Sequence, residues 1–245
     1  MPTKLRKITA DDLYRFEIIS HSEISPDGMK VIYAIKTVNR ATEGTVSHLW
    51  IASAEGAAAG AAAGGRQKQF TFGDQSDTSP RWSPDGKQIA FLSNRGDKKQ
   101  TQIYLIPVDG GEARPLTKLQ GEIGGFEWSP DGKQIVVQFR KRDTDDLERE
   151  ADEHKKKLGI VARHYDRVHY KLDGYGYLPK ELWHLWLINT RTGKARQLTD
   201  HPVYEELQPV WSPDGSQIAF MSNRSDDPDL DPDAVDLFVA SSTTG

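Results

Sequence analysis

Short apolar runs recur along the chain, and four of them follow the same tetrapeptide. Ser-Pro-Asp-Gly occurs at residues 25–28, 83–86, 129–132 and 212–215. Proline presets the backbone of a type I turn, and glycine takes the left-handed conformation that closes a bulged hairpin. Trp82, Trp128 and Trp211 stand immediately before three of the copies. The pattern therefore predicts four hairpins, each at the same place in a structural repeat.

The apolar runs around these turns predict units of four antiparallel strands. The second repeat is the clearest, with strands expected at residues 78–83, 88–93, 102–108 and 112–117. Four strands in about 40 residues is the size of one β-propeller blade. We therefore predict an all-β fold: a partial β-propeller of four-stranded blades, with about four blades present. The expected blades cover residues 18–72, 78–118, 124–200 and 207–245.

The spacing of the tetrapeptides locates two additions to this repeat. Successive copies begin 58, 46 and 83 residues apart. The first interval exceeds the second by 12 residues, which is the length of the Ala- and Gly-rich run at residues 54–65. We expect that run to be a flexible hairpin loop. The third interval exceeds the second by 37 residues, which predicts a helical and hairpin insertion in the third blade at about residues 141–180.

Two helices are expected outside the sheets. Residues 8–16 precede the first strand and favour a short helix capped by Thr9. Residues 144–158 begin with acidic and end with basic side chains, and Gly159 follows them. That order complements a helix dipole and supplies a C-terminal cap, so it predicts a helix.

Residues 161–177 are rich in Tyr, His and Arg. Alternation of Val168, Tyr170 and Leu172 indicates a strand, and Asp173-Gly174 indicates a turn. One interpretation is a hairpin extension that buries its own tyrosines. The other is an element that faces the central tunnel or a neighbouring catalytic domain. On this second interpretation Arg163, Tyr170 and Asp173 are candidates for substrate binding.

Composition narrows the classes of protein that remain. The 245 residues carry 32 basic and 36 acidic side chains, and a net charge of −4 argues against a nucleic-acid partner. There is no cysteine, which excludes disulfides, thiolate metal sites and a cysteine nucleophile. The first 20 residues have no apolar core of a signal peptide, and no run is long enough for a membrane-spanning helix. We therefore expect a cytoplasmic protein with no membrane partner.

The motifs of common catalytic and metal sites are missing from the sequence. No Gly-x-Ser-x-Gly, His-Glu-x-x-His, phosphate loop or dinucleotide fingerprint occurs. Residues 226–233 alternate acids like a calcium loop but lack its glycine and final glutamate, so we expect a solvated loop. We expect no metal, no cofactor and no catalytic residue in this chain. Tyr204, Glu205 and Glu206 precede the fourth blade, where a solvent-facing connection is the plainer interpretation.

Three stretches of the sequence resemble a known protein family. Residues 82–95 and 211–224 share the pattern Trp-Ser-Pro-Asp-Gly-x-x-Ile-Ala-Phe-x-Ser-Asn-Arg, which resembles the propeller repeat of the prolyl oligopeptidase family and of Tol-system propellers. The opening at residues 8–13, with the turn at residues 25–28, is similar to acylaminoacyl-peptidase and dipeptidyl-aminopeptidase-like members. So is Tyr-Lys-Leu-Asp-Gly-Tyr-Gly at residues 170–176 ahead of His-Leu-Trp at residues 184–186.

The resemblance implies a propeller of seven or eight blades that caps a C-terminal α/β-hydrolase domain. In that family a Ser-Asp-His triad cleaves short peptides, and the propeller restricts access to it. In the dipeptidyl-peptidase branch a pair of glutamates holds the ammonium group of the substrate, which makes Glu205 and Glu206 candidates for substrate binding. The hydrolase domain is not found in these 245 residues, so this segment alone is expected to be inactive.

Two functions therefore stay open. The first is the N-terminal propeller segment of a serine peptidase, which gates and selects short peptides for a missing hydrolase domain. Its partners would be the hydrolase domain, the rest of the propeller, peptide substrates and, through unpaired outer blades, a second copy of itself. The alternative is a stand-alone Tol-type or WD-like propeller that serves as a protein- or glycan-binding scaffold.

Overall fold

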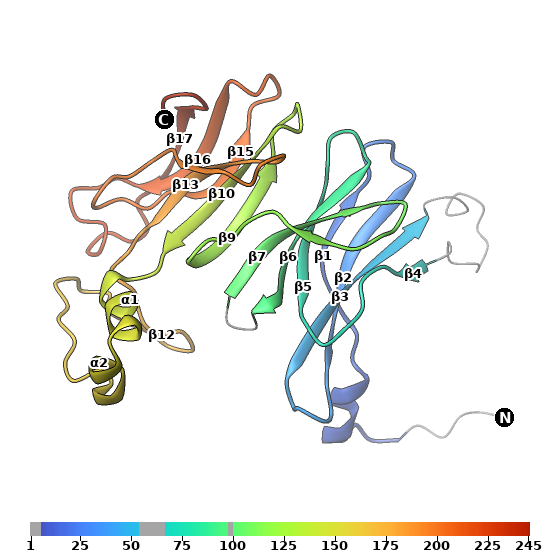
Figure 1. Ribbon diagram of the computed structural model, residues 1–245, viewed down its shortest axis with the longest axis horizontal. Coiled ribbons are helices and arrows are strands. Elements are labelled where there is room, and N and C mark those ends of the chain that lie inside the picture. The colour runs from blue at the N-terminus through green and yellow to red at the C-terminus, as the bar shows by residue number, and fades with distance from the viewer. Residues whose placement is uncertain (1–5, 54–66, 98–99) are drawn as a thin grey trace. The chain divides into compact units, whose positions relative to one another are not determined.

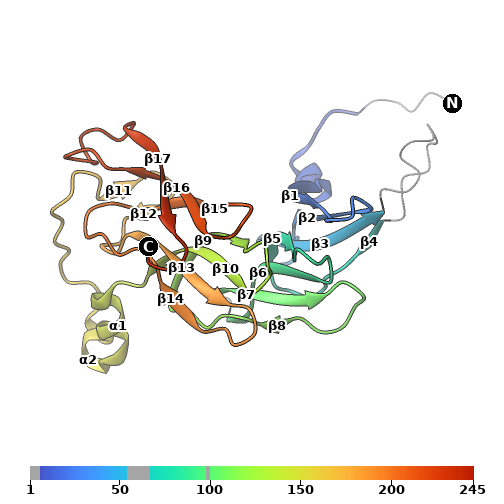
Figure 2. The ribbon, with the colours of Figure 1, turned by 90° about the horizontal axis from the view of Figure 1, so that it is seen from above.

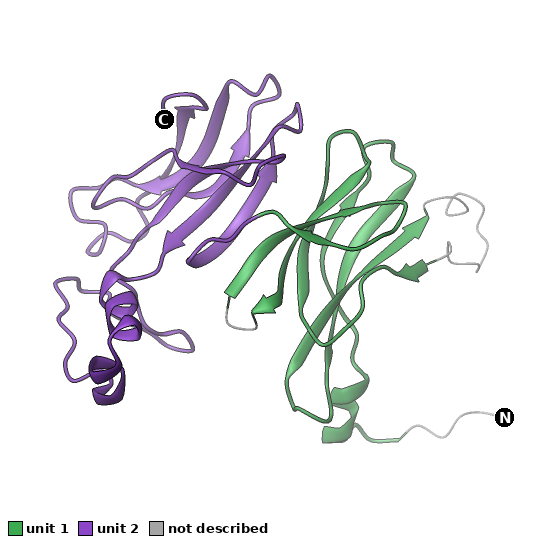
Figure 3. Ribbon diagram, in the orientation of Figure 1, with its two compact units in different colours: residues 1–116 green, residues 117–245 purple. Residues whose placement is uncertain are grey.

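The computed structural model of the protein describes residues 6–53, 67–97 and 100–245. The chain forms two compact units, Met1–Leu116 and Thr117–Gly245 (Figure 3). The Ala- and Gly-rich run at residues 54–65, for which we expected a flexible hairpin loop, lies outside the described residues.

Unit 1 consists of a short helix and two four-stranded antiparallel sheets (Figure 1). A 3₁₀ helix, η1 (Ala10–Arg15), precedes the first sheet. The strands of the two sheets follow one another in sequence order, so each sheet is a simple meander. The first sheet contains β1 (Ile18–Ile24), β2 (Lys30–Val38), β3 (Thr45–Ser53) and β4 (Gln67–Gln69), and the second contains β5 (Asp77–Trp82), β6 (Gln88–Asp97), β7 (Gln100–Pro107) and β8 (Arg114–Pro115).

Unit 2 repeats this plan with a long addition. Between its first two and last two strands, one sheet is interrupted by the segment 142–182, here called the long connection. The four-stranded sheet contains β9 (Gly121–Trp128), β10 (Gln134–Lys141), β13 (Trp183–Asn189) and β14 (Ala195–Gln197). The long connection contains α1 (Thr144–Ala151), α2 (Glu153–Leu158), β11 (Lys171–Leu172) and β12 (Gly176–Tyr177). The last sheet contains β15 (Leu207–Trp211), β16 (Gln217–Asn223) and β17 (Val235–Ser241), and Figure 2 shows it from above.

The Ser-Pro-Asp-Gly turns have the geometry that the sequence predicts. In the turn at Ser212, for example, the Gly215 N–H donates to the Ser212 carbonyl at 2.9 Å, and Gly215 has a φ of 72°. The Ser212 hydroxyl donates to Asp214 at 2.6 Å. Gly28, Gly86 and Gly132 likewise have positive φ, a conformation that glycine adopts without strain. Each copy of the tetrapeptide joins the first two strands of a sheet.

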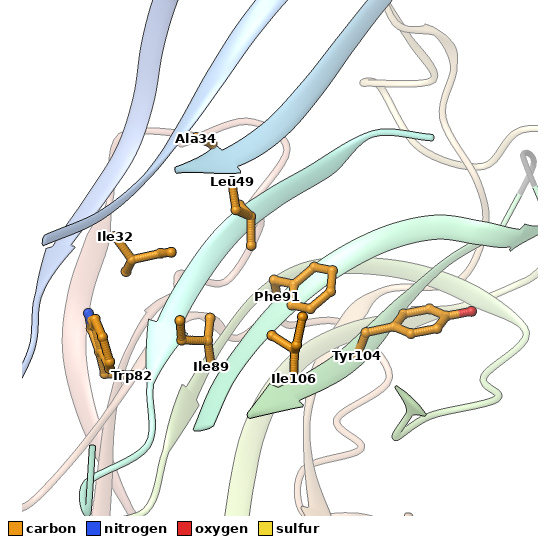
Figure 4. Close-up of a cluster of buried hydrophobic side chains, with 8 residues drawn as sticks. All are labelled: Ile32, Ala34, Leu49, Trp82, Ile89, Phe91, Tyr104 and Ile106. Carbon is orange, nitrogen blue, oxygen red and sulfur yellow. The ribbon is translucent and has the colours of Figure 1, made fainter. Parts of the chain in front are cut away.

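Within each unit, the two sheets pack face to face over an apolar core. Figure 4 shows this cluster in unit 1, with Ile32, Ala34 and Leu49 on one sheet and Trp82, Ile89, Phe91, Tyr104 and Ile106 on the other. Phe91 and Ile89 are fully buried, and burial of one such side chain stabilises the fold by about 1.5–3 kcal/mol. In unit 2 the corresponding cluster includes Val136, Leu185, Leu187, Ile218 and Phe220.

Two of the tryptophans that precede a turn, Trp82 and Trp211, also join the two sheets of their unit through polar contacts. The Trp82 N–H donates to the Glu23 carboxylate at 2.5 Å, and its indole N–H donates to the Glu23 carbonyl at 3.2 Å. Trp211 makes the same two bonds to Glu127, at 3.2 and 3.3 Å. The two units are thus built to one pattern, down to individual side-chain contacts.

The all-β prediction is confirmed: the described residues form several antiparallel sheets with little helix, consistent with a propeller-like fold. The number of blades, their boundaries and the assignment of residues 141–180 as an insertion stay predictions. In the long connection the expected helix at residues 144–158 is two short helices, because Asp152 accepts hydrogen bonds from the N–H groups of His154 and Lys155 and begins α2. Gly159 ends α2, as expected.

Two further expectations about local structure need correction. The helix predicted at residues 8–16 is a 3₁₀ helix of six residues, in which Asp12 accepts from the Thr9 N–H at 2.8 Å. The strand predicted from the alternation of Val168, Tyr170 and Leu172 is reduced to the two residues of β11. Its short hairpin with β12 does turn at Asp173 and Gly174, where Gly174 has a φ of 78°.

A candidate binding pocket and a buried carboxylate network

Unit 2 contains a pocket of about 440 Å³ between the long connection and two loops of the last sheet. The long connection supplies aromatic, charged and apolar side chains, among them Tyr165, Tyr170 and Lys180. The loop after β14 contributes Pro202 and Val203. The opposite wall is the acidic loop between β16 and β17, residues 226–229. A volume of this size is within the range of small-ligand sites.

One residue of the acidic loop, Asp229, fastens the long connection at this pocket. Its carboxylate accepts hydrogen bonds from the Arg167 guanidinium at 2.8 Å and from the Val168 N–H at 3.0 Å. The His169 ring bonds the Asp229 carbonyl at 3.0 Å. The hydrogen bond from Arg167 holds the pKa of the Asp229 carboxyl below its ordinary value. Asp229 is therefore an ionised clamp for the long connection, and the expectation that residues 226–233 are merely a solvated loop fails at this position.

The tyrosines of the long connection stack on one another instead of being buried. Tyr165 stacks on Tyr177 with ring centroids 5.8 Å apart, and Tyr170 lies 5.2 Å from Tyr165. The Arg163 guanidinium lies 4.6 Å from the centre of the Tyr177 ring, in cation–π geometry. Tyr170 and Tyr177 are 47% and 49% exposed. The expectation of a hairpin that buries its own tyrosines is therefore wrong, and an aromatic surface borders the pocket.

The β11–β12 hairpin is anchored to the four-stranded sheet by a charged group. Arg140 is 93% buried at its side chain and donates to Glu122 at 2.6 Å and to the Tyr175 hydroxyl. Its guanidinium also lies 4.5 Å from the centre of the Trp183 ring. Burial raises the pKa of the Tyr175 hydroxyl, and the hydrogen bond that it donates to Glu122 adds to the rise. Tyr175 therefore remains a neutral donor at ordinary pH.

The five residues that the sequence singled out for substrate binding have different surroundings. Tyr170 lines the pocket, and Arg163 joins the aromatic surface beside it. Asp173 lies in the exposed turn of the β11–β12 hairpin and does not line the pocket. Glu205 is half-buried and accepts from the Trp183 N–H at 3.3 Å. Substrate binding by these residues stays a prediction.

Glu206 differs sharply from its neighbour, because it is 1% exposed. One carboxylate oxygen accepts from the Thr199 hydroxyl at 2.8 Å and lies 2.8 Å from His184 Nδ1. The other lies 3.7 Å from the Arg224 guanidinium. A solvent-facing connection is therefore wrong for Glu206, which joins the sheet of β13 to the sheet of β15.

The repeat explains why a carboxylate stands there. Glu206 is five residues before Trp211, and Asp77 is five residues before Trp82. Asp77 is fully buried and pairs with Arg95 at 2.8 Å, as Glu206 pairs with Arg224. Residues 48–50 and 184–186 share the sequence His-Leu-Trp, so each unit brings a histidine, an acid and an arginine to the same place in its repeat.

The two networks differ at the histidine. In the described part of the chain, His48 Nδ1 and Asp77 Oδ1 are both buried without a hydrogen-bond partner. In unit 2 the acid is a glutamate that contacts His184. In unit 1 it is an aspartate, whose side chain is one methylene shorter, and this accounts for the missing contact with His48. Alignment of the repeats on their tryptophans would have identified Asp77 and Glu206 as equivalent acidic residues. No local signal marks the contact between Arg167 and Asp229, which are 62 residues apart in sequence.

Among the described residues, no group of three or more His, Asp or Glu side chains could hold a metal ion. No helix in that part of the chain has the length and apolar character needed to cross a membrane.

The sheets, their meander order and the repeated turn define a β-propeller domain. Residues 20–160 match the PD40 family, described as TolB beta propeller domain, and the chain belongs to this family.

Its relatives are peptidases. The chain is 30% identical over 226 residues to YuxL, an uncharacterized peptidase of Bacillus subtilis, and covers 32% of that protein with 91% of its own length. It is 27% identical over 223 residues to dipeptidyl-peptidase 5 of Porphyromonas gingivalis, with 84% of this chain and 30% of that protein covered. The chain therefore spans about a third of the length of the curated relatives that it matches.

A solved peptidase has the same fold. The acylaminoacyl peptidase of Pyrococcus horikoshii superposes with a TM-score of 0.68 at 19% sequence identity, over 94% of this chain and 32% of that one. The resemblance to peptidases with a propeller segment is thus supported by both sequence and fold, and the stand-alone scaffold is not favoured.

Proposed function

We propose that this chain is the propeller segment of a serine peptidase and selects short peptides for a hydrolase domain encoded outside these 245 residues. The similarity to YuxL and dipeptidyl-peptidase 5 supports a peptidase parent. The observation that carries the proposed role is the pocket of about 440 Å³ bordered by the long connection. It is large enough for a few residues of an extended peptide and far too small for a folded protein.

The side chains around the pocket suit a peptide. Aromatic rings such as Tyr165 and Tyr170 offer apolar surface for peptide side chains, while Lys180 and Asp226 offer groups that could bind its charged ends. The clamp between Arg167 and Asp229 fixes the wall on which these groups stand. The propeller segment would bind and admit the substrate, and the nucleophile would come from the hydrolase domain.

Peptide binding to the chain itself tests this role. Titration with the tripeptide Gly-Gly-Phe, followed by heteronuclear NMR, should shift signals of residues 164–170 and 226–229. Tyr170→Ala should weaken binding at least fivefold, because it removes a ring that lines the pocket. Asp173→Ala is the matched control, since Asp173 belongs to the same segment but lies outside the pocket, and it should bind like the unchanged chain.

The outcomes separate the proposal from its rivals. No shift in the pocket with Gly-Gly-Phe at millimolar concentration would overturn peptide selection at this site. Equal loss of binding in Tyr170→Ala and Asp173→Ala would mean that the peptide binds elsewhere. Hydrolysis of a fluorogenic peptide by the purified chain would contradict the assignment of the nucleophile to another domain.

A further inference from the structure

The pocket of unit 2 has more acidic than basic side chains in its walls. Besides two histidines, its charged lining residues are one arginine, one lysine and four aspartates, namely Arg167, Lys180, Asp166, Asp226, Asp227 and Asp229. Both basic side chains already have a carboxylate partner. Arg167 donates to Asp229 at 2.8 Å, and Lys180 Nζ donates at 2.8 Å to Asp145, which does not line the pocket. The walls therefore keep an excess of negative charge.

Two of the aspartates account for this excess. Asp166 and Asp226 are exposed at the pocket, and the side chain of neither forms an ion pair or hydrogen bond with another residue that the structure describes. Asp227 differs from them, because its carboxylate accepts a hydrogen bond from the Asp229 N–H at 3.1 Å. Asp166 lies on the long connection and Asp226 on the acidic loop, so one unpaired carboxylate stands on each of two walls.

The basic residues of the pocket respond to the same negative field. The pKa of Arg167 is raised, first by its hydrogen bond to Asp229, and the charge of Asp166 adds to the rise. The pKa of Lys180 is also raised, first by its hydrogen bond to Asp145, and Asp166 again contributes. Each cation is thus stabilised by more carboxylates than the one that it contacts. A further cation that enters the pocket meets the same attraction.

The aromatic part of the wall suits a long basic side chain. Tyr165 and Tyr170 line the pocket with their ring centroids 5.2 Å apart. Such rings pack against methylene groups and attract a cation at their faces. The Arg163 guanidinium already lies in this way over Tyr177 of the same aromatic surface. The Tyr165 hydroxyl oxygen is buried and has no hydrogen-bond partner among the described residues, so it is an acceptor that an N–H group of a ligand would satisfy.

We propose that this pocket selects peptides that contain a lysine or an arginine, and that Asp166 and Asp226 neutralise the basic side chain. The inference rests on the proposed selection of peptides and names the class of peptide. The amino terminus of a peptide carries the same kind of charge, but one terminus neutralises only one of the two carboxylates. An acidic side chain is disfavoured at this place, because it would meet like charges.

A pair of acetylated tripeptides isolates the charge of the side chain. N-acetyl-Gly-Lys-Phe and N-acetyl-Gly-norleucine-Phe both lack a charged amino terminus, and both have four side-chain carbons at the central residue. Only the first has a side-chain ammonium group. In heteronuclear NMR titrations of the whole chain at low salt, we expect the lysine peptide to bind at least fivefold more tightly. This advantage should shrink in about 0.5 M sodium chloride, because salt screens charges that are exposed to solvent.

Replacement of the unpaired aspartates tests the assignment to residues. Asp166→Asn and Asp226→Asn keep the shape of the side chain, and neither side chain forms a bond within the described part of the chain that the change would break. Each variant should lower the advantage of the lysine peptide to about twofold or less and leave the affinity for the norleucine peptide unchanged. Asp173→Asn is the matched control, because it removes one carboxylate from the same long connection outside the pocket. Its preference for lysine should equal that of the unchanged chain.

The outcomes distinguish this inference from the proposed function. Equal affinity for the two acetylated peptides, with signals shifted at the pocket, would refute the choice of a basic side chain and leave peptide selection intact. If neither peptide binds and Gly-Gly-Phe does not bind either, both proposals fail. Tighter binding of Gly-Gly-Phe than of its acetylated form, without any advantage for lysine, would assign the two aspartates to the amino terminus and reject the side chain. A preference for lysine that falls equally in Asp173→Asn would reflect the net charge of the chain and contradict a site at Asp166 and Asp226.

Discussion

Replacement of Glu206 by Gln tests whether the buried carboxylate holds the two sheets of unit 2 together. The change keeps the shape of the side chain and removes its charge. The oxygen that meets His184 and Thr199 can be kept as the amide oxygen. The other oxygen of the Glu206 side chain lies 3.7 Å from the Arg224 guanidinium and accepts no hydrogen bond from a described residue. The amide NH₂ that replaces it can no longer neutralise the cation and is a buried donor without a partner.

The magnitude follows from these contacts. A buried donor without a partner costs about 1–3 kcal/mol, and hydrogen bonds to a charged group exceed neutral ones by about 1 kcal/mol each. Arg224 is 38% exposed at its side chain, so water compensates part of the lost ion pair. We expect Glu206→Gln to lower the free energy of unfolding by about 3 kcal/mol.

Urea unfolding followed by tryptophan fluorescence measures the effect, and the midpoint should fall by about 1 M or more for a protein with an m-value of about 2–3 kcal/mol per molar. Glu205→Gln is the matched control. Glu205 accepts one N–H at 3.3 Å, which an amide oxygen also accepts, so the free energy of unfolding of this variant should stay within about 0.5 kcal/mol of that of the unchanged chain. The reasoning is refuted if Glu206→Gln is as stable as the unchanged chain but binds Gly-Gly-Phe more weakly, since that combination describes a substrate ligand.

Three further predictions concern the repeat and the pocket. Asp77→Glu should raise the free energy of unfolding by about 1 kcal/mol in a urea titration, because the longer acid can meet His48 and satisfy two buried groups; a loss of stability would contradict this. The pKa of Asp214 is lowered to about 2, mainly because its carboxylate accepts a hydrogen bond from the Ser212 hydroxyl. The ionised carboxylate therefore stabilises the folded state above the unfolded pKa of about 3.9, and this stabilisation is lost as the pH falls through about 2. In Ser212→Ala an NMR titration should find that pKa moved up toward its ordinary value, and an unchanged pKa would refute the assignment. Asp229→Ala should speed hydrogen exchange of the long connection roughly tenfold and leave β16 unaffected, whereas equal acceleration in both would mean general destabilisation.

The sheets could be predicted from sequence because their signals are local. A fixed turn and a period of two in the flanking residues locate a strand to within a few positions, as at β1 and β17. The long connection carried weaker signals. The expected single helix is divided at Asp152, because this aspartate accepts hydrogen bonds from two N–H groups and so caps the start of a second helix. The pocket could not be found this way, since it depends on contacts such as the one between Arg167 and Asp229.

The two acids before the fourth repeat illustrate how a repeat separates framework from function. The position of Glu206 is acidic in both units and buried in both, with an arginine partner each time. That recurrence, together with the bonds to His184 and Thr199, assigns Glu206 to the framework. Glu205 has no such constraint. It is half-buried, and its charge contributes, after the hydrogen bond and charge of Asp229, to the raised pKa of Arg167 at the pocket. If one acid of the pair meets a peptide, the structure therefore favours Glu205, because Glu206 would have to abandon three partners to do so.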